Sequence, residues 1–219
     1  MGAAGRVVVV GLGPGGAEHV TVETLATIGR VERRYLRTAR HPSAHLVPDA
    51  VTFDELCESA DRFDDVYAEI TERLVAAAAE HGEVLYAVPG SPLVLERSVR
   101  TLRADARIAC LVLPAMSFLD VAWGRLGIDP VEEAVRLIDG HEFATAAANA
   151  TGALLVAHTH ANWVLSDIKL SIDDPTGDLD ATPVVLLQAL STPDERVVAT
   201  TWADMDRTID ADHLTCLYI

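Results

Sequence analysis

The segment Val7-Val8-Val9-Val10-Gly11-Leu12-Gly13-Pro14-Gly15-Gly16 decides the fold class of this chain. Its four consecutive valines predict a buried strand, and the glycines and proline after them predict a tight turn. The turn formally matches GxGxxG, a pattern typical of dinucleotide sites in which a helix opens at the third glycine and an acidic residue ends the second strand. Here a loop is expected up to Thr21, and the second strand, near residues 33–36, ends in Arg37-Thr38. These two differences make a dinucleotide site the least favoured interpretation of this turn.

Short apolar runs and helix-period stretches alternate in the first half of the chain, which predicts a parallel α/β sheet. The second half changes character, because helical stretches follow one another and the last runs are joined by turns typical of a more antiparallel sheet. We therefore expect two domains, 1–114 and 115–219. The predicted strands are Val7–Val10, residues 33–36, Val84–Val88, Ile108–Leu113, Ala153–Ala157, Val184–Leu187, a strand around Val197 and Leu214–Ile219. The predicted helices are Glu23–Arg30, Asp64–Glu80, Phe118–Leu126, Val131–Ile138 and Trp163–Leu170.

Composition excludes several classes of function. The 219 residues carry a net charge of −16, and Lys169 is the only lysine. No basic stretch long enough for a nucleic acid or an anionic membrane surface is present, so neither is expected as a partner. The first apolar run is too short for a signal peptide or a membrane span, which predicts a cytoplasmic protein. Cys57, Cys110 and Cys216 show no metal-ligand spacing, so no metal is expected and the last two read as buried thiols.

Two further loops resemble the first in position. Val88-Pro89-Gly90-Ser91-Pro92 and Pro114-Ala115-Met116-Ser117-Phe118 each follow a predicted buried strand. The carboxyl ends of parallel strands meet at one edge of a sheet, where open α/β sheets bind their ligands. Glycine and proline fix such loops and let the backbone approach a ligand closely.

Together, these loops resemble the tetrapyrrole (corrin/porphyrin) methylase family of S-adenosylmethionine (SAM)-dependent methyltransferases. The resemblance covers nearly the whole chain and is closest to the methylase-like N-terminal domain of MazG-type nucleotide pyrophosphohydrolases. The motifs that carry it are Gly11-Leu12-Gly13-Pro14-Gly15, Leu36-Arg37-Thr38-Ala39-Arg40-His41-Pro42, Tyr86-Ala87-Val88-Pro89-Gly90-Ser91-Pro92-Leu93-Val94-Leu95-Glu96, Ser117-Phe118-Leu119-Asp120, Gly127-Ile128-Asp129-Pro130 and Ser166-Asp167-Ile168-Lys169-Leu170.

The resemblance implies two α/β domains, a parallel first sheet, a mixed second sheet and a SAM site in the cleft between them, with S-adenosylhomocysteine (SAH) as product. The implied cofactor contacts are Pro14, Gly90, Ser91, Leu93, Val94, Ser117, Phe118, His158, Gln188 and His213. Weaker candidates on the substrate side, and for catalysis, are Arg37, His41 and Tyr67. Methylases acting on tetrapyrroles usually carry Gly-Asp-Pro where this chain has Gly90-Ser91-Pro92, and that difference disfavours a porphyrinoid acceptor.

Three functions follow as hypotheses. The leading one is a SAM-dependent methyltransferase with a small-molecule or peptide acceptor. The alternatives are a non-catalytic SAM- or SAH-binding regulatory domain of a MazG-type pyrophosphohydrolase and a peptide backbone N-methyltransferase. The family resemblance also predicts a homodimer. The chain stops within an apolar run at Ile219, which suggests either that a longer protein continues beyond it or that this strand closes a sheet edge.

Overall fold

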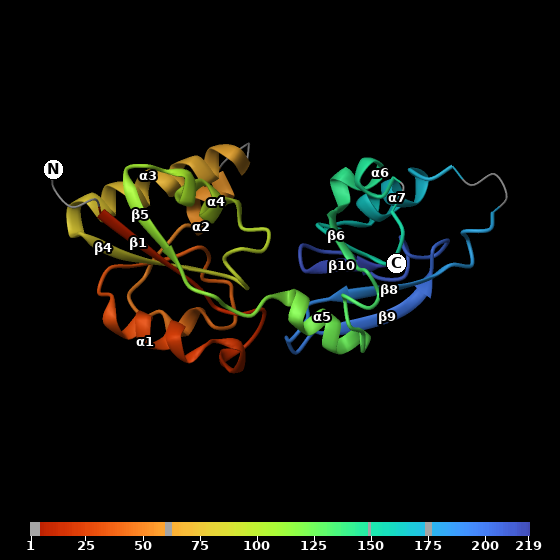
Figure 1. The fold of residues 1–219 in the computed structure, drawn as a ribbon, viewed down its shortest axis with the longest axis horizontal. Coiled ribbons are helices and arrows are strands. Elements are labelled where there is room, and N and C mark those ends of the chain that lie inside the picture. Colours follow the sequence, from red (N-terminus) through yellow and green to blue (C-terminus); the bar gives the residue numbers. More distant parts are fainter. Residues whose placement is uncertain (1–4, 60–62, 149, 174–176) are drawn as a thin grey trace. The chain divides into compact units, whose positions relative to one another are not determined.

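The computed structural model describes residues 5–59, 63–148, 150–173 and 177–219. The chain forms two compact units, Met1–Phe118 and Leu119–Ile219, each built around a five-stranded sheet (Figure 1). The expected fold class, α/β with a parallel first sheet and a mixed second sheet, is confirmed.

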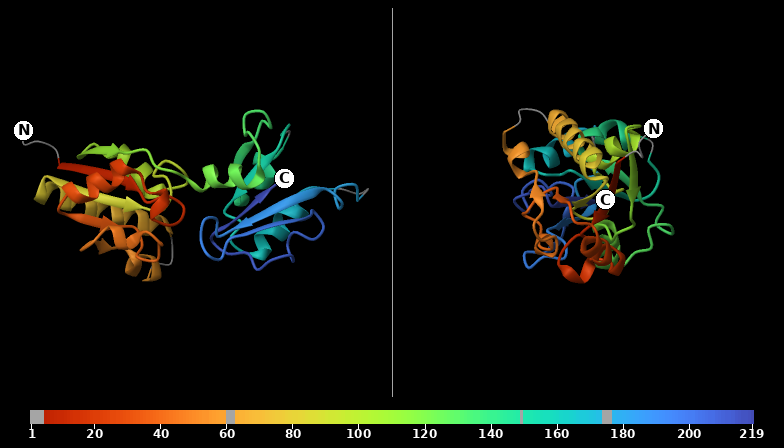
Figure 2. Two further views of the ribbon diagram at one scale, coloured as in Figure 1. Left: turned by 90° about the horizontal axis from the view of Figure 1, so that it is seen from below. Right: turned by 90° about the vertical axis from the view of Figure 1, so that its left-hand side faces the viewer.

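The first sheet has the strand order β3-β2-β4-β1-β5, and every neighbouring pair is parallel. Figure 2 shows β1 in the interior of the sheet, between β4 and β5. The strand bounds are β1 Gly5–Gly11, β2 Arg34–Leu36, β3 Val51–Thr52, β4 Glu83–Val88 and β5 Ile108–Val112. Because β1 and β4 are covered on both faces, their side chains form almost continuous apolar runs, as buried parallel strands require.

Helices cover both faces of this sheet (Figure 1). On one face, Ile70 and Leu74 of α3 pack with Val9 and Tyr86 in the larger core cluster. On the other face, Ile28 of α1 packs with Leu85. The predicted cap of α1 is confirmed, because the Thr21 side chain accepts a hydrogen bond from Thr24 N–H. The helices of this unit are η1 Ala17–His19, α1 Val22–Arg30, η2 Ala44–Leu46, α2 Asp54–Ser59, α3 Phe63–His81 and α4 Arg97–Ala104.

The second sheet has the order β6-β7-β10-β8-β9, in which only β6 and β7 pair in parallel. Strand β10 is therefore interior, and the expectation that the last strand closes an edge is wrong. The strand bounds are β6 Arg136–Asp139, β7 Leu154–Ala157, β8 Pro183–Gln188, β9 Arg196–Thr201 and β10 Thr215–Tyr218. The helices of this unit are α5 Phe118–Leu126, η3 Gly140–Glu142, α6 Phe143–Ala146 and α7 Asn162–Leu170.

One predicted helix, Val131–Ile138, is absent. The Asp129 side chain accepts a hydrogen bond from Val131 N–H and begins a series of turns, and Ala134 has a left-handed φ of 50°. The chain then enters β6, where Ile138 is buried and Leu137 is exposed. A short apolar pattern fits both the helical period and the strand period, and the pairing of this segment with β7 selects the strand.

The SDIKL motif has a structural role in the second unit. Lys169 of α7 donates to a carboxylate oxygen of Asp206 at 2.6 Å and to the carbonyl of Ala203 at 3.1 Å, while Ser166 donates to the other oxygen of Asp206 at 2.9 Å. Asn162 of the same helix donates to the carbonyls of Asp206 and Ile209. The only lysine of the chain thus ties the segment after β9 to α7.

Among the described residues, no helix has the length and apolar character needed to cross a membrane. Within the same described ranges, no group of three or more His, Cys, Asp or Glu side chains could hold a metal ion. Cys216 is buried, as expected, and burial raises the pKa of its thiol to about 12. Cys110 is only half-buried, since it lies on the edge strand β5, and the side chain of Cys57 lies outside the described part of the chain.

Candidate functional site

The loops after β1 and β4 are joined to each other through their glycines. Gly13 N–H donates to the carbonyl of Gly90 at 3.2 Å, and Gly90 N–H donates to the carbonyl of Gly13 at 2.8 Å. Both glycines adopt left-handed backbone, with φ of 71° and 60°, a region that other residues enter only with strain. The Gly90 N–H is therefore occupied by its bond to Gly13. Any contact of Gly90 with a ligand depends on the open space beside its Cα.

The third loop reaches the same point. A Cβ added at Gly11 would lie 2.3 Å from the Gly90 carbonyl oxygen, 2.5 Å from the Ala115 Cβ and 2.8 Å from the Pro92 Cδ. Residues of all three predicted loops therefore converge on one glycine at the end of β1. At Gly90, by contrast, an added Cβ would meet nothing within 4 Å. The loops are therefore closely packed at Gly11, whereas the Cα of Gly90 faces open space.

The loop after β2 clamps the first loop from the side. Ser43 N–H donates to His41 Nδ1 at 3.1 Å, so Nδ1 is an acceptor and the proton resides on Nε2, which donates to the Gly13 carbonyl at 2.9 Å. The buried Ser43 hydroxyl donates to the carbonyl of Gly15 at 2.9 Å. Burial lowers the pKa of His41 and outweighs the opposing effect of its bond to Gly13, which favours the neutral ring. With both ring nitrogens engaged, His41 acts as a support for the loop.

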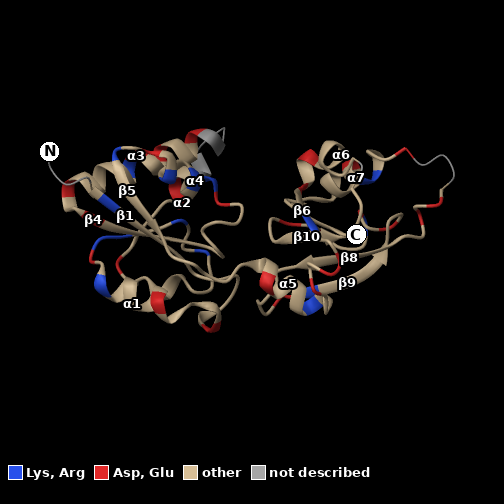
Figure 3. Ribbon diagram, viewed as in Figure 1, with Lys and Arg blue, Asp and Glu red and all other residues tan. Residues whose placement is uncertain are grey.

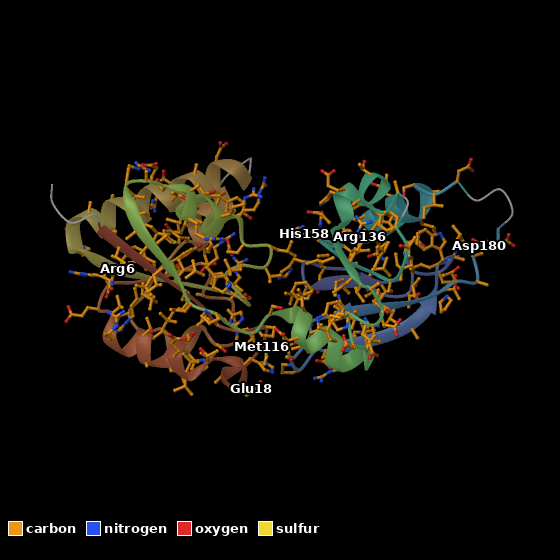
Figure 4. The ribbon with its side chains drawn as sticks, in the orientation of Figure 1. Arg6, Glu18, Met116, Arg136, His158 and Asp180 are labelled. Atoms are coloured by element: carbon orange, nitrogen blue, oxygen red, sulfur yellow. The ribbon has the colours of Figure 1, made fainter. Side chains whose placement is uncertain are left out.

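The remaining first-unit candidates line the same edge with different exposure. Ser117 is buried, whereas Pro14, Ser91, Val94 and Phe118 are half-buried. Leu93 is 60% exposed, and Leu95 and Met116 add apolar surface on the loops after β4 and β5; Met116 is labelled in Figure 4. A hydrophobic surface beside rigid backbone suits a ligand with both apolar and polar parts.

A residue missed by the sequence reasoning also lies at the first loop. His19 packs against Gly13, where an added Cβ would be 2.6 Å from the His19 Cβ. Its Nδ1 is buried and has no hydrogen-bond partner among the described residues. The sequence feature that could have identified His19 is a histidine shortly after the glycine-rich turn.

Arg37 and Tyr67, predicted on the substrate side, are in contact. The guanidinium of Arg37 lies 5.6 Å from the centroid of the Tyr67 ring. Arg97, which sequence reasoning did not select, lies 5.9 Å from the same centroid. Arg37 N–H donates to the carbonyl of Ala87 at 2.9 Å, which fixes this group beside the end of β4.

The three second-unit candidates gather at one edge of the second sheet. Gln188 ends β8 opposite Thr215, the first residue of β10, and the hydroxyl of Thr159, just after β7, donates to the carbonyl of Thr215. His158, labelled in Figure 4, and exposed His213 flank these strand ends. The Gln188 amide donates to the carbonyl of Asp210 at 2.8 Å, so it supports the segment before β10.

His158 has two unusual features. Its φ of 60° is left-handed without being glycine, a conformation that costs about 1–3 kcal/mol and is found at functional sites more often than elsewhere. Its Nδ1 lies 2.8 Å from a carboxylate oxygen of Asp139, whose other oxygen accepts from His141 N–H at 3.0 Å. Burial raises the pKa of Asp139, but hydrogen bonds from His158 and His141 outweigh it, and the net pKa is lowered.

Comparison with known proteins agrees with this architecture. A curated relative, the uncharacterized protein YabN of Bacillus subtilis, is 28% identical over 99% of this chain, and the chain spans 45% of that protein's length. Solved structures with the same fold include the uroporphyrin-III C-methyl transferase of Thermus thermophilus, complexed with S-adenyl homocysteine, with a TM-score of 0.71, 16% identity and coverage of 98% of this chain and 96% of that one. The precorrin-6Y methylase of Archaeoglobus fulgidus gives a TM-score of 0.68 at 23% identity, with coverage of 97% and 96%.

The family comparison covers both units. The model of the Tetrapyrrole (Corrin/Porphyrin) Methylases matches residues 6–206, which include all three loops of the first unit and most of the second sheet. The chain therefore belongs to the tetrapyrrole (corrin/porphyrin) methylase family.

Proposed function

We propose that this chain is a SAM-dependent methyltransferase and that the loops after β1, β4 and β5 hold the cofactor. The observation that carries the proposal is the packing of these loops around Gly11, which leaves open space at Gly90 in a chain of the methylase family. The SAH complex of the Thermus thermophilus structure supports the choice of ligand. Pro14, Ser91, Val94, Ser117 and Phe118 complete the proposed binding surface.

The residues present fit such a ligand. Exposed Leu93 and Met116 offer apolar contact, and half-buried Ser91 offers a hydroxyl. When bound, SAM supplies a methyl group activated on a sulfonium. The chain's own contribution is then to hold a rigid backbone surface, because alignment of two reactants provides much of the acceleration of such a transfer. A general base is needed only if the acceptor's nucleophile arrives protonated.

Calorimetry with SAH and NAD tests the proposal. We expect SAH to bind with a Kd near 1 μM, about −8 kcal/mol, and NAD not to bind. NAD binding without SAH binding would overturn the methylase proposal in favour of the dinucleotide interpretation.

A matched pair of glycine variants tests the location. Gly90 and Gly82 both have left-handed φ, 60° and 79°, and an added Cβ meets nothing within 4 Å at either. Gly90 lies at the carboxyl edge of the first sheet, whereas Gly82 precedes β4 at the amino edge. Both valine variants carry backbone strain of about 1–3 kcal/mol. We expect Gly90→Val to weaken SAH binding at least tenfold, about 1.4 kcal/mol, and Gly82→Val to leave it within twofold. Equal losses in the two variants would place the site elsewhere.

A second candidate is a regulatory SAM-binding unit within a larger protein, such as a MazG-type pyrophosphohydrolase. The length of the curated relative, of which this chain spans 45%, favours it. Turnover separates the two functions, because a sensor binds SAM and SAH and forms no methylated product. Mass analysis after incubation with labelled SAM and cell-extract metabolites or peptides makes the distinction, and a methylated peptide backbone would select the N-methyltransferase alternative.

The homodimer and the cytoplasmic location stay predictions. Exposed Leu111 on the edge strand β5 offers apolar surface for pairing. Light scattering at tens of micromolar measures the assembly, and a clean monomer would count against the dimer.

A further inference from the structure

Four residues after β2 form a turn whose geometry follows from their sequence. In His41-Pro42-Ser43-Ala44, Ala44 N–H donates to the carbonyl of His41 at 2.9 Å, which closes a β-turn. Proline fixes the backbone that a type I turn needs at its second position, and Ser43, with φ of −91° and ψ of 9°, has the values typical of the third position. The turn therefore holds His41 and Ser43 on a rigid support.

The side chains of His41 and Ser43 hold the first loop on either side of Pro14. His41 Nε2 donates to the Gly13 carbonyl at 2.9 Å, and the Ser43 hydroxyl donates to the Gly15 carbonyl at 2.9 Å. Pro14, which belongs to the proposed cofactor surface, lies between these two carbonyls in the chain. Ser43 is fully buried and His41 is half-buried, which limits competition by water for the two bonds. His41 and Ser43 thus form a clamp on the first loop.

The clamp also reaches the loop after β4 through a shared acceptor. The Gly13 carbonyl that accepts from His41 also accepts from Gly90 N–H, at 2.8 Å. A carbonyl oxygen has two lone pairs and can accept both bonds. Loops after β1, β2 and β4 therefore meet at one oxygen atom, and movement of this atom displaces Gly90 and Pro14 together.

The clamp requires a neutral His41 ring. Nδ1 accepts from Ser43 N–H at 3.1 Å, so a proton added to Nδ1 would face another donor and neither hydrogen would have an acceptor. Burial lowers the pKa of His41 and outweighs the bond to Gly13, which raises it, so the folded loop favours the neutral ring. Protonation of the ring breaks the bond to Ser43 N–H and loosens the hold on Gly13.

Two further ionisable groups lie on the first loop's side of the clamp. His19 packs against Gly13, where an added Cβ would be 2.6 Å from the His19 Cβ. The Glu18 carboxylate lies 3.9 Å from Nδ1 of His19. Titration of His19 or Glu18 therefore has to be distinguished from titration of His41.

The ionisable groups on the segment that carries His41 are engaged elsewhere. The Asp54 carboxylate, at the start of α2, interacts with the charges of Arg40 and Arg37. His45 is exposed, and its Nδ1 lies 2.9 Å from the carbonyl of Pro42. His45 therefore provides a matched control, because it is a histidine of the same segment that does not touch the first loop's carbonyls.

We propose that His41 and Ser43 are positioning residues for the cofactor, and that SAH binds to the form of the protein in which the His41 ring is neutral. The inference rests on the proposed methyltransferase function, which supplies the ligand. Because both ring nitrogens are occupied by the protein, His41 acts through the backbone of the first loop and not as a catalytic base.

Calorimetric titration with SAH at about pH 7.5 and about pH 5 tests the coupling. The Kd of wild type should rise at least threefold on acidification, because the fraction of molecules with a neutral ring falls as the pH passes through the folded pKa. His41→Gln keeps a neutral donor for Gly13 and should change less than twofold between the two pH values, with a Kd within threefold of wild type at the higher one. His41→Leu removes the donor and should weaken binding at least fivefold at both pH values.

Ser43→Ala separates the two bonds of the clamp. It removes the hydroxyl that bonds to Gly15 but keeps the backbone N–H that donates to His41 Nδ1. We expect SAH binding to weaken about threefold while the pH dependence of wild type is retained. His45→Gln should match wild type at both pH values, and circular dichroism checks that every variant is folded.

Two results would overturn the proposal. One is an equal pH dependence of the Kd in wild type and His41→Gln, and the other is loss of the pH dependence in His19→Gln or Glu18→Gln while His41→Gln retains it. NMR of the free protein adds a test without ligand. The amide signals of Gly13, Gly15 and Gly90 should move between the two pH values in wild type and stay fixed in His41→Gln, and fixed signals in wild type overturn the clamp. No SAH binding by wild type overturns the proposed function, and the coupling with it, even where these signals move.

Discussion

The two units use the same number of strands, but different groups hold most of their loops. In the first unit, backbone groups hold backbone groups, since Gly13 and Gly90 are bonded to each other and three loops meet at Gly11. In the second unit, polar side chains do this work: Lys169 and Asn162 fasten the segment after β9, and Gln188 fastens the segment before β10. The first arrangement leaves Leu93 and Met116 exposed on the loops, whereas the second uses Lys169, Asn162 and Gln188 to hold the scaffold.

Charge follows the same division. The first unit, residues 1–118, carries 12 arginines against 16 acidic residues, whereas residues 119–219 carry 5 basic and 17 acidic residues (Figure 3). Most of the net charge of −16 therefore belongs to the second unit. The arginines of the first unit include Arg37 and Arg97, whose guanidinium groups both lie near the ring of Tyr67.

The largest effect is expected from a methyl group at Gly11, because it would lie 2.3 Å from the Gly90 carbonyl oxygen at the point where the three loops meet. Gly11→Ala should destabilise the protein by about 3 kcal/mol or more and abolish SAH binding. Thermal unfolding and calorimetry measure the two losses. Gly29→Ala is the control, because that helical glycine has nothing within 4 Å of an added Cβ and should gain about 0.5–1 kcal/mol. Similar stability of the two variants would contradict the convergence of the loops.

A smaller effect is expected where side chains hold the second unit. Lys169→Met leaves a carboxylate oxygen of Asp206 without its 2.6 Å partner in a partly buried place, which should cost about 1–3 kcal/mol. Urea unfolding measures this loss. Arg207→Met, which breaks the exposed pair with Asp204 in the same segment, should cost less than about 0.5 kcal/mol. Equal costs would show that the anchor contributes no more than a surface ion pair.

The sequence correctly predicted the features that depend on local residue pattern and on the order of elements along the chain. The buried valines of β1, the Thr21 cap and the apolar face of α3 were all confirmed, because each is decided within a few neighbouring residues. The helix predicted over residues 131–138 was wrong, because pairing with β7, which is distant in the sequence, overrides a weak helical period. The short elements β3 and α4 were not predicted.

Contacts between loops that are distant in the sequence could not be predicted from it. The three loops were placed correctly after β1, β4 and β5, yet nothing in their residues showed that Gly13 and Gly90 would bond to each other. Arg97 lies one residue beyond the motif that ends at Glu96, and its contact with Tyr67 was not predicted because Tyr67 belongs to another helix. Such contacts depend on partners that only the fold brings together.

The smallest expected effect concerns His41, which together with Ser43 holds the first loop by side-chain hydrogen bonds, as polar side chains do in the second unit. Burial lowers its pKa below the ordinary value of 6.5, so the folded protein binds fewer protons here than the unfolded chain does just below that pH. Its stabilising contribution is therefore present above about pH 6.5 and is lost as the pH falls through the folded pKa. Protonation places a hydrogen on Nδ1, which then no longer accepts from Ser43 N–H. Urea midpoints between about pH 7.5 and about pH 5.5 should fall more steeply for wild type than for His41→Gln. His45→Gln, at an exposed histidine of the same segment, should keep the wild-type slope, and a wild-type slope in His41→Gln would show that the clamp does not titrate.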